Sequence, residues 1–377
     1  MKFYRPTLAE IDLGAIRHNL EITSHIVKAG TKILGVVKAD AYGHGMQEVS
    51  KAIVDYVDYF GVASLDEAAI LRSIGIKKPI LVIGAILPEE IEGVLKFNVI
   101  QTVSDLDIPK RLSKLALSKN KKIKVHVKVD TGMGRLGFWH EEAVGFVKKI
   151  AKLKNIIIDG IFTHFPNAES DRVFTYNQIK NFKRLIKELW DNDIYIPVKH
   201  TANSMGLIDF KDSHMNMVRP GLMMYGIYPK ESLMRNIRLR PALTLKTKIT
   251  HLKSMPKGRS ISYGMTYITK KPTKIATIPV GYGDGYSRNF SNKAEVLINS
   301  SRCPIAGRVC MDMCMIDVGH LKNVKVGDDV ILIGSQGKEI IRAEELAGLI
   351  NTIPYEVLCN IGCRVPRVYI YKCKGRE

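Results

Sequence analysis

The sequence contains few of the residues that mark a disulfide-rich or zinc-stabilised protein. Only six of its 377 residues are cysteine, all in the last fifth of the chain, and no two of them form a CxxC pair. The motifs CMDMC and CNIGC lack the histidines that usually complete a structural zinc site. We therefore expect reduced thiols and no bound metal. The six thiols are Cys303, Cys310, Cys314, Cys359, Cys363 and Cys373.

Long apolar stretches are also missing. No uninterrupted apolar run is long enough to cross a bilayer, and the opening residues, MKFYRPTLAEIDLG, have no apolar core of the kind that a signal peptide needs. The composition, 46% hydrophobic and 25% charged, is that of a soluble globular protein. These features predict a cytoplasmic protein without a membrane partner.

Acidic residues are scarce relative to basic ones. The chain has 57 lysines and arginines against 37 aspartates and glutamates, which gives a net charge of +20. Such an excess can indicate a nucleic-acid partner. However, the basic residues are spread over segments such as KNKKIK and NFKRLIKEL, and aromatic residues are not interleaved with them as in a base-stacking platform. Solvated helix faces explain most of this charge, and we expect no nucleic-acid partner.

What the chain does contain, up to about residue 235, is a regular alternation of short apolar runs and amphipathic segments. Asp12 is placed to cap a helix that Gly30 would end, and a second helix carries the apolar stripe Phe182, Leu185, Ile186, Leu189 and Trp190. Eight strand–helix units in this length predict a parallel (β/α)8 barrel of the TIM type. The eight predicted strands are 32–38, 59–63, 79–84, 98–103, 123–129, 156–162, 195–200 and 215–226.

The pattern changes near residue 238. From there, successive strand-like segments are joined by Gly, Pro and Asn turns, and a single helical segment, AEELAGLIN, interrupts them. This predicts a mostly antiparallel β domain after the barrel. We therefore divide the chain into a barrel domain over residues 1–237 and a C-terminal β domain over residues 238–377.

The barrel prediction selects a set of candidate site residues, because chemistry in such barrels lies at the C-terminal ends of the strands. Loops after strands 7 and 8 often bind phosphate, and here they hold Ser204 and the backbone of Gly221 and Leu222. An amine facing a phosphate site suggests a phosphorylated carbonyl cofactor held as a Schiff base. The polar residues at the predicted strand ends are Lys38, Lys128, Asp130, His164, His200, Asn203, Ser204 and Arg219.

Lys128 raises a problem of buried charge. In the predicted strand 123–129 the apolar residues alternate with Lys124, His126 and Lys128, so the basic face points into the barrel. A buried ammonium must be paired or chemically modified. Neutralisation by Asp130 and modification of the amine both remain open from the residues alone.

Taken together, the motifs resemble those of alanine racemases, in order and over nearly the whole chain. They are VVKADAYGHG, VKVDTGMGRLGF, THF, HTANSMG, VRPGLMMYG, SYGMTY, PVGYGDGYSR, GRVCMDM and YEVLCNIGCRVPR. The resemblance implies a pyridoxal 5′-phosphate enzyme with a (β/α)8 barrel and a β domain. It also implies a homodimer in which each active site takes residues from the other subunit's C-terminal domain.

The resemblance assigns a role to each matching position. Lys38 would form the internal aldimine with the cofactor and act as one base, and Tyr263 of the partner subunit would be the opposite base. Arg219 would face the pyridine nitrogen and keep it unprotonated, because arginine only donates hydrogen bonds. His200 would support Arg219. The other cofactor-binding positions would be Tyr42, His164, Asn203, Ser204, Gly221, Leu222 and Tyr355.

Further positions match the substrate site. Arg135 would meet the substrate carboxylate, and Lys128 matches a lysine that is often carbamylated in the family, which would turn the buried cation into an anion. The substrate-binding residues implied by the resemblance are Arg135, Met311, Asp312 and Tyr282. One departure follows the THF motif, where PNAESD introduces Pro166 and Glu169.

The function that these residues predict is interconversion of L-alanine and D-alanine, which supplies D-alanine for peptidoglycan. A broad-specificity or serine racemase on the same scaffold is an alternative. A related basic-amino-acid decarboxylase would carry an acidic residue in place of Arg219. A non-enzymatic pyridoxal-phosphate-binding protein would resemble the barrel alone, and the C-terminal domain with Tyr263 disfavours it.

Overall fold

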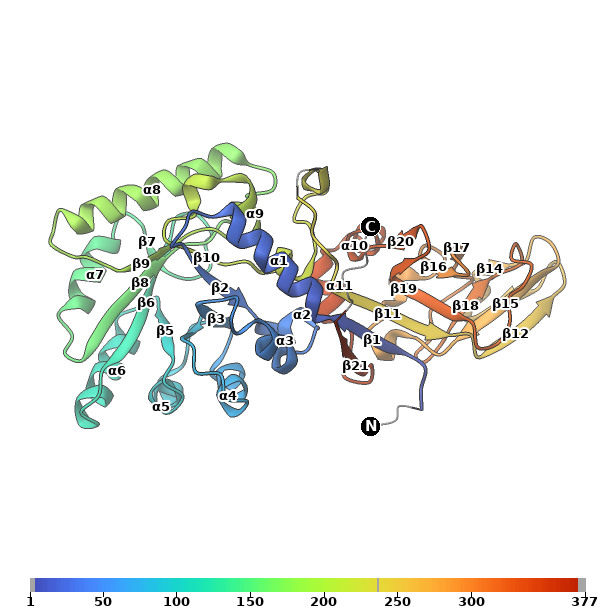
Figure 1. The fold of residues 1–377 in the computed structure, drawn as a ribbon, viewed down its shortest axis with the longest axis horizontal. Coiled ribbons are helices and arrows are strands. Elements are labelled where there is room, and N and C mark those ends of the chain that lie inside the picture. Colours follow the sequence, from blue (N-terminus) through green and yellow to red (C-terminus); the bar gives the residue numbers. More distant parts are fainter. Residues whose placement is uncertain (1–3, 236, 372–377) are drawn as a thin grey trace.

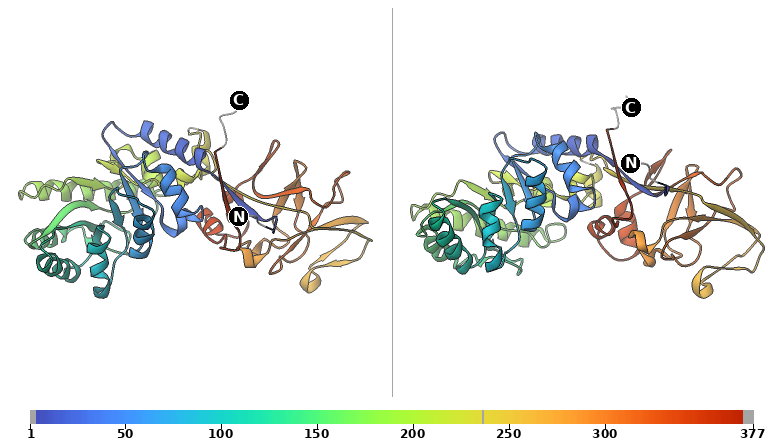
Figure 2. Two further views of the ribbon diagram at one scale, coloured as in Figure 1. Left: turned by 60° about the horizontal axis from the view of Figure 1, so that its bottom comes forward. Right: turned by 90° about the horizontal axis from the view of Figure 1, so that it is seen from below.

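The computed structural model describes residues 4–235 and 237–371, so Cys373 lies outside the described residues. Two bodies lie end to end along the long axis of the molecule (Figure 1). One is a barrel built from the first part of the chain, and the other is a β domain built mainly from the last third. The views in Figure 2 keep the two bodies separate, joined through a narrow region near both ends of the chain.

The barrel consists of eight parallel strands in the order β10, β2, β3, β4, β5, β6, β8, β9, and its two end strands approach each other. Every predicted strand is present, so the predicted barrel is confirmed. The last strand is shorter than predicted because Pro220 has no N–H to donate and Leu222–Tyr225 turns into a 3-10 helix, η3. The strands are β2 Lys32–Val36, β3 Tyr59–Val62, β4 Ile80–Val82, β5 Ile100–Val103, β6 Ile123–Asp130, β8 Ile156–Phe162, β9 Val198–His200 and β10 Met217–Val218.

Helices cover the outside of the barrel. The predicted cap is confirmed, because the Asp12 carboxylate accepts the Ala15 N–H at 3.1 Å at the start of α1. In α8, Phe182 and Leu189 are buried as predicted, but Trp190 is 61% exposed. Trp190 is the last residue of that helix and packs edge-on against Tyr195 instead of the core. The helices are α1 Leu13–Ile26, α3 Met46–Ile53, α4 Leu65–Ser73, α5 Ile91–Lys96, α6 Asp107–Ser118, α7 Ala143–Ala151, α8 Arg172–Trp190 and the short α9 Ser204–Asp209.

The second domain is mostly antiparallel, as predicted. Its large sheet has the order β17, β16, β19, β11, β1, β21 with β20 beside β19, and a smaller sheet has the order β12, β15, β18. Two helices interrupt the strands, so the prediction of a single helix was wrong: α11 follows α10, and its six residues begin at a proline. The elements are β11 Leu243–Lys248, β12 His251–Met255, β15 Thr273–Ile278, β16 Glu295–Ile298, β17 Ser301–Pro304, β18 Cys314–Asp317, β19 Asp329–Gln336, β20 Glu339–Ile341, α10 Ala343–Leu349, α11 Pro354–Cys359 and β21 Arg367–Ile370, with the hairpin β13 Ser260–Ile261 and β14 Tyr267–Ile268.

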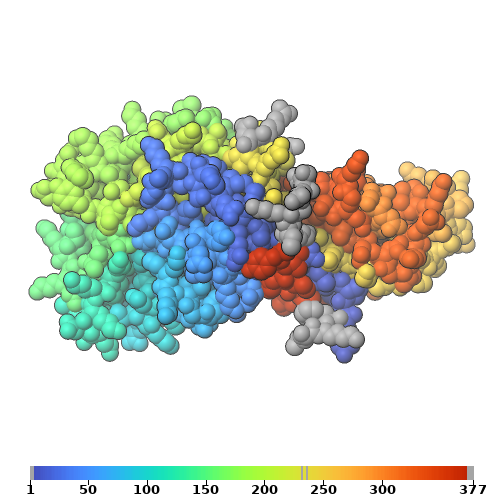
Figure 3. Space-filling view, viewed as in Figure 1, coloured from blue at the N-terminus to red at the C-terminus, as the bar shows by residue number. Residues whose placement is uncertain are grey.

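The N-terminal strand joins the two bodies. β1 (Leu8–Asp12) pairs antiparallel with β11 and parallel with β21, so it completes the sheet of the second domain before the chain enters the barrel at α1. The C-terminal helix α11 contacts α2 (Lys38–Tyr42) of the barrel. Figure 3 shows this red C-terminal segment beside the blue barrel surface. The C-terminal segment with Ile353 and Tyr355 therefore borders the mouth of the barrel.

Within the described residues, no helix combines the length and apolarity that a membrane span requires. The described cysteines, Cys303, Cys310, Cys314, Cys359 and Cys363, are free thiols. No group of three or more His, Cys, Asp or Glu side chains in the described residues is arranged to hold a metal ion.

Candidate active site

A cavity of about 400 Å³ opens at the C-terminal ends of the barrel strands. It collects most of the candidate residues, from five different strand ends and from α11. Apart from Leu222, the apolar walls of the cavity were not predicted, because an apolar side chain at a strand end looks the same in the sequence as a core residue. The lining is Val36, Lys38, Tyr42, Ile83, Lys128, Arg135, Leu136, Phe162, His164, Asn203, Ser204, Arg219, Gly221, Leu222, Ile353 and Tyr355.

Lys38 begins an unusual turn. One residue, Val37, separates it from β2, and the next four residues, Ala39 to Tyr42, all have φ between 51° and 55°. These values are left-handed, and no glycine is among the four, so each residue adds a cost of about 1–2 kcal/mol. Such strain persists only where the surroundings impose it. The segment labelled α2 is therefore a left-handed turn that sets the position of the Lys38 amine.

Several contacts hold the left-handed turn in place. The Glu67 carboxylate accepts the N–H groups of Ala39 at 2.7 Å and Ala63 at 2.6 Å, which ties the loops after β2 and β3 together. The Asp40 carboxylate accepts the Met46 N–H at 2.7 Å at the start of α3. Such charge-assisted bonds are among the stronger hydrogen bonds in proteins.

The end of the turn rests on the C-terminal part of the chain. Gly43 has φ 81°, and a Cβ there would lie 2.4 Å from the Leu358 carbonyl oxygen, so only glycine fits. The Gly43 carbonyl accepts a hydrogen bond from Arg367 Nε at 3.1 Å. A Cβ on Gly45 would lie 1.8 Å from the Tyr369 hydroxyl. The glycines of the YGHG motif thus permit close contact with α11 and β21.

His44 is buried beneath the same turn. Its Nδ1 lies 3.0 Å from the carbonyl oxygens of both Ala41 and Tyr42, and its ring stacks on Tyr225 at 4.5 Å. The Tyr225 hydroxyl in turn donates to the Val36 carbonyl at the end of β2. His44 therefore links the turn to the strand that precedes Lys38.

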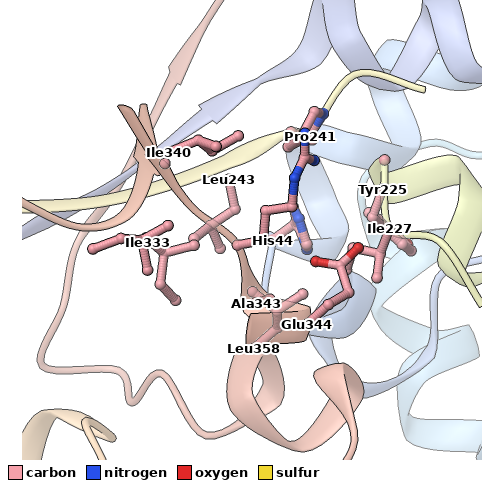
Figure 4. A pocket seen from close by; sticks show the side chains of 15 residues that line it. His44, Tyr225, Ile227, Pro241, Leu243, Ile333, Ile340, Ala343, Glu344 and Leu358 are labelled. Carbon is pink, nitrogen blue, oxygen red and sulfur yellow. The ribbon is translucent and has the colours of Figure 1, made fainter. Parts of the chain in front are cut away.

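A second, small cavity lies beside His44, between the barrel and the second domain (Figure 4). Its volume is about 30 Å³, too small for a cofactor or an amino acid. Leu243, Ile333 and Leu358 contribute apolar walls from the second domain. This cavity belongs to the junction between the two bodies rather than to a substrate site.

The loops after β9 and β10 form a compact polar cradle. Ser204 Oγ accepts the N–H groups of Gly221 at 3.1 Å and Met223 at 3.3 Å, so its own hydrogen is free to be donated elsewhere. A Cβ on Gly221 would lie 2.9 Å from the Tyr42 hydroxyl. Tyr42 packs between Tyr225 and Tyr355. The cradle brings together hydroxyl donors from distant parts of the chain, as an anion requires.

Arg219 lines the same cavity and is 5% exposed. Its Nη1 donates to His200 Nδ1 at 2.8 Å, and its Nη2 donates to the carbonyl oxygens of Thr163 and Thr201 at 2.9 Å each. Nη2 also lies 3.4 Å from His164 Nδ1. Burial lowers the pKa of Arg219 to about 9, which still leaves the guanidinium charged at neutral pH.

Lys128 points into the barrel, as the alternation in its strand predicts. It is 3% exposed, its Nζ has no hydrogen-bond partner in the described part of the chain, and it lies 4.9 Å from the centre of the Phe162 ring. Burial and the nearby Arg219 lower the pKa of Lys128 to about 7. Asp130 does not pair with it, because the Asp130 carboxylate accepts three backbone N–H groups, those of Gly132, Met133 and Gly134.

The cations at the cavity influence one another. Burial and then Arg135 lower the pKa of Lys38, which favours its neutral amine. Burial and the same set of cations lower the pKa of His164 well below its usual range, so His164 is neutral. Arg135 itself is exposed at the rim. The cavity is therefore a positive region in which His164 is neutral and the neutral amine of Lys38 is favoured. Such a setting is suited to binding anions and abstracting protons.

Four candidate residues lie elsewhere. Tyr263, Tyr282, Met311 and Asp312 are on the second domain and do not line the cavity. They are brought together there, because Ser262 Oγ donates to the Arg308 carbonyl at 2.7 Å and the N–H of Tyr282 donates to the Cys310 carbonyl at 3.0 Å. Tyr263 is 72% exposed and Met311 is 53% exposed. One chain thus carries two separate groups of candidate residues.

Known proteins resemble the chain along nearly its whole length. The family model described as "Alanine racemase, N-terminal domain" matches residues 11–229, and "Alanine racemase, C-terminal domain" matches residues 242–369. An alanine racemase of Halothermothrix orenii is 48% identical over 98% of both chains, and one of Methanococcus maripaludis is 45% identical over 97% of this chain and 99% of that one.

Solved structures agree with the sequence comparison. The alanine racemase of Clostridium difficile 630 has a TM-score of 0.92 at 41% identity and covers 98% of this chain and 97% of its own. The alanine racemase of Bacillus anthracis with bound L-Ala-P has a TM-score of 0.91 at 37% identity and covers 100% of this chain and 98% of its own.

The burial of His44 predicts a pH dependence of stability. Burial lowers the pKa of His44 to about 4, whereas an unfolded histidine titrates near ~6.5. Between these values the unfolded chain binds more protons, so stability present above pH ~6.5 is lost as the pH falls towards 4. In His44→Gln, the loss of unfolding free energy between pH 7 and pH 5 should be smaller than in the wild type by on the order of 2 kcal/mol.

Urea unfolding at the two pH values measures this difference. Exposed His251 of β12 offers a matched control, and His251→Gln should show the wild-type loss. An unchanged pH dependence in His44→Gln would contradict the assignment of a buried, neutral His44.

Proposed function

The chain belongs to the alanine racemase family, and from this premise we propose that it interconverts L-alanine and D-alanine with bound pyridoxal 5′-phosphate. We further propose that it acts in the cytoplasm as a homodimer and supplies D-alanine for peptidoglycan. The observation that carries the proposal is the cavity itself, in which a half-buried amine, a hydroxyl cradle and a buried arginine converge.

The residues present fit this cofactor. A Lys38 amine with a lowered pKa suits a carbonyl partner, and the cradle of Tyr42, Ser204 and the Gly221 backbone suits a phosphate. Arg219 would meet the pyridine nitrogen as a hydrogen-bond donor, and His164 and Asn203 would border the ring. Leu222 and Tyr355 would complete the phosphate site. When bound, the cofactor supplies a carbonyl that condenses with amines and a ring that withdraws electrons from the α-carbon.

The chain's own residues would then move the α-proton. Lys38 Nζ would accept or return it on one face, which the lowered pKa of Lys38 favours. Tyr263 of the partner subunit would serve the other face through its hydroxyl oxygen. Arg135, at the rim, would hold the substrate carboxylate, and Met311, Asp312 and Tyr282 of the partner subunit would narrow the site around a small side chain. Two bases on opposite faces account for production of both enantiomers.

The exposure of Tyr263 supports the shared site. Its turn (η5, Tyr263–Met265) lies on the second domain, which extends away from the barrel (Figure 1). A closed cyclic dimer presents the same surface of each subunit to the other, so two such turns could reach two barrel mouths.

The unpaired Lys128 amine supports a further part of the proposal, its carbamylation. The nitrogen of a neutral amine forms a bond to the carbon of CO₂, the electron pair of one C=O π bond moves to its oxygen, and the nitrogen loses one proton to water. The product is an anion, which the adjacent Arg219 and Arg135 would stabilise. That anion would fix Arg135 for the substrate and remove the cost of a buried cation.

A broad-specificity or serine racemase is the second candidate, because the same cavity would accept a slightly larger side chain. Comparable turnover of alanine, serine and lysine would favour it. The family membership and the second domain with its Tyr263 turn argue for an enzyme rather than a carrier of the cofactor.

Mixing two inactive variants tests the shared site. Lys38→Ala and Tyr263→Phe homodimers should each be nearly inactive. In a mixed dimer one site has both changes and the other has neither, so random exchange of equal amounts should restore about a quarter of wild-type racemase activity. Recovery of no activity from subunits shown to exchange would contradict a site built from two chains.

Exchange of the α-proton in deuterated water tests the two bases. Wild-type protein should exchange both alanine enantiomers. Tyr263→Phe should lose exchange of one enantiomer by about 100-fold or more and retain much of the exchange of the other, because only one face loses its base. Equal loss for both enantiomers would argue against two separate bases.

Carbamylation is measured by ¹³C NMR of the protein under ¹³CO₂. A carbamate signal should grow from pH 6 to pH 8 at fixed CO₂ pressure, because the fraction of neutral Lys128 amine rises through a pKa of about 7. Lys128→Ala should lack the signal, whereas Lys124→Met, a change on the same strand, should retain it. A signal that survives Lys128→Ala would place the carbamate elsewhere.

A further inference from the structure

A series of buried polar side chains leads from Arg219 through the barrel interior, by way of His200 and His126, to Asp159. His200 Nε2 lies 2.9 Å from His126 Nδ1, and His126 Nε2 lies 3.5 Å from Asp159 Oδ2. His126 and His200 are fully buried, and Asp159 is 7% exposed. The last of these contacts is an ion-pair contact, and His126 Nε2 makes no hydrogen bond within the described residues. The four residues of this series belong to neighbouring parts of the barrel: Arg219 follows β10, and the other three lie on β9, β6 and β8.

The backbone makes room for this series of side chains. A Cβ on Gly160 would lie 2.5 Å from the His126 ring, so the glycine that follows Asp159 is required for the imidazole to fit. The pairing of β6 with β8 shifts register between Val125 and His126, which sets His126 against Gly160. Phe162 stacks on His200 at 4.6 Å with ring planes 5° apart. Both imidazole rings are therefore held in fixed positions.

The donor and acceptor groups determine the direction of both hydrogen bonds in this series, the one between Arg219 and His200 and the one between His200 and His126. A guanidinium only donates, so His200 Nδ1 must accept from Arg219. Burial lowers the pKa of both His200 and His126, so each ring is neutral and carries one proton. The proton of His200 is then on Nε2 and is donated to His126 Nδ1. By the same reasoning the proton of His126 is on Nε2 and faces Asp159.

The charge at the Asp159 end of the series agrees with the tautomers that Arg219 determines at the other end. The Asp159 carboxylate is ionised, because the His126 contact and Lys124 hold its pKa below the usual range, and an ionised carboxylate only accepts. Lys124 Nζ binds its other oxygen at 2.8 Å, and the Tyr59 hydroxyl lies 3.5 Å from Oδ2. The donor-only Arg219 fixes the tautomers from one end, and the negative charge of Asp159 at the other end favours the same placement of the His126 proton on Nε2.

We propose that His126 and Asp159 are positioning residues for Arg219. They hold His200 in the tautomer that presents a lone pair to the guanidinium, and they place a negative charge at the far end of an aligned series of dipoles. The orientation and charge of Arg219 at the cavity depend on this series. The role of Arg219 rests on the proposed function, in which it faces the cofactor ring. The tautomers of His126 and His200 do not depend on that function, because they follow from the protein's own hydrogen-bond donors and acceptors.

Neutron diffraction from crystals of the deuterium-exchanged holoenzyme tests the tautomers directly. Deuterium is expected on Nε2 and not on Nδ1 of both His126 and His200. Deuterium on Nδ1 of either ring, or on both nitrogens, would overturn the proposal. Because this result requires no catalysis, it is distinguishable from a failure of the proposed racemase function.

A pair of variants at one position tests the consequence for Arg219. His126→Leu removes the acceptor that orients His200, whereas His126→Gln keeps an acceptor oxygen and a donor N–H. We expect kcat to fall about tenfold in His126→Leu with KM for alanine within about twofold, and to recover to within about threefold of the wild type in His126→Gln. With ¹⁵N-labelled pyridoxal phosphate, the ring-nitrogen signal should move in His126→Leu and return in His126→Gln.

Further variants test whether His126 and Asp159 act on Arg219 together. Asp159→Leu should resemble His126→Leu, and the double variant should be no worse than either, because the two residues act in one series. Lys124→Met removes the exposed partner of Asp159 and should stay within about twofold of the wild type. Equal impairment of His126→Leu and His126→Gln, or wild-type behaviour of both, would show that the series does not act on Arg219.

Discussion

The guanidinium of Arg219 is held inside the barrel by neutral acceptors, an imidazole nitrogen of His200 and the carbonyl oxygens of Thr163 and Thr201. Its charge persists there because burial lowers its pKa only to about 9. Burial and then that charge lower the pKa of the neighbouring groups, to about 7 for Lys128 and well below the usual range for His164 and His200, so both histidines stay neutral. The positive cavity that results is suited to the phosphate and carboxylate groups that we propose it binds.

Much of the barrel is visible in the sequence, because each buried parallel strand appears as a short apolar run and each helix as a periodic one. Lys38 could be placed at the mouth for the same reason. The pairing of Leu8–Asp12 with β11 and β21 could not be predicted, because it joins segments far apart in the chain. The same is true of the His126–His200 contact, which depends on a register shift between β6 and β8.

Local chemistry explains where the interpretation of single residues was wrong or incomplete. Asp130 looked like a partner for Lys128, but the backbone N–H groups of a glycine-rich turn satisfy its carboxylate instead. Phe162 ends an apolar strand and looks like a core residue in the sequence, although its ring contacts Lys128, Arg219 and His200. An aromatic face at that position accommodates cations without adding a carboxylate that would cancel their charge.

The left-handed turn after Lys38 has a consequence for the order of folding. Four non-glycine residues with positive φ have no stability of their own, and their supports include Leu358 of α11 and Arg367 of β21, near the other end of the chain. A nascent chain that has completed all eight barrel strands still lacks both supports. The complete set of contacts around the Lys38 turn can therefore form only after α11 and β21, the last helix and strand of the chain, have been synthesised and have docked against the barrel.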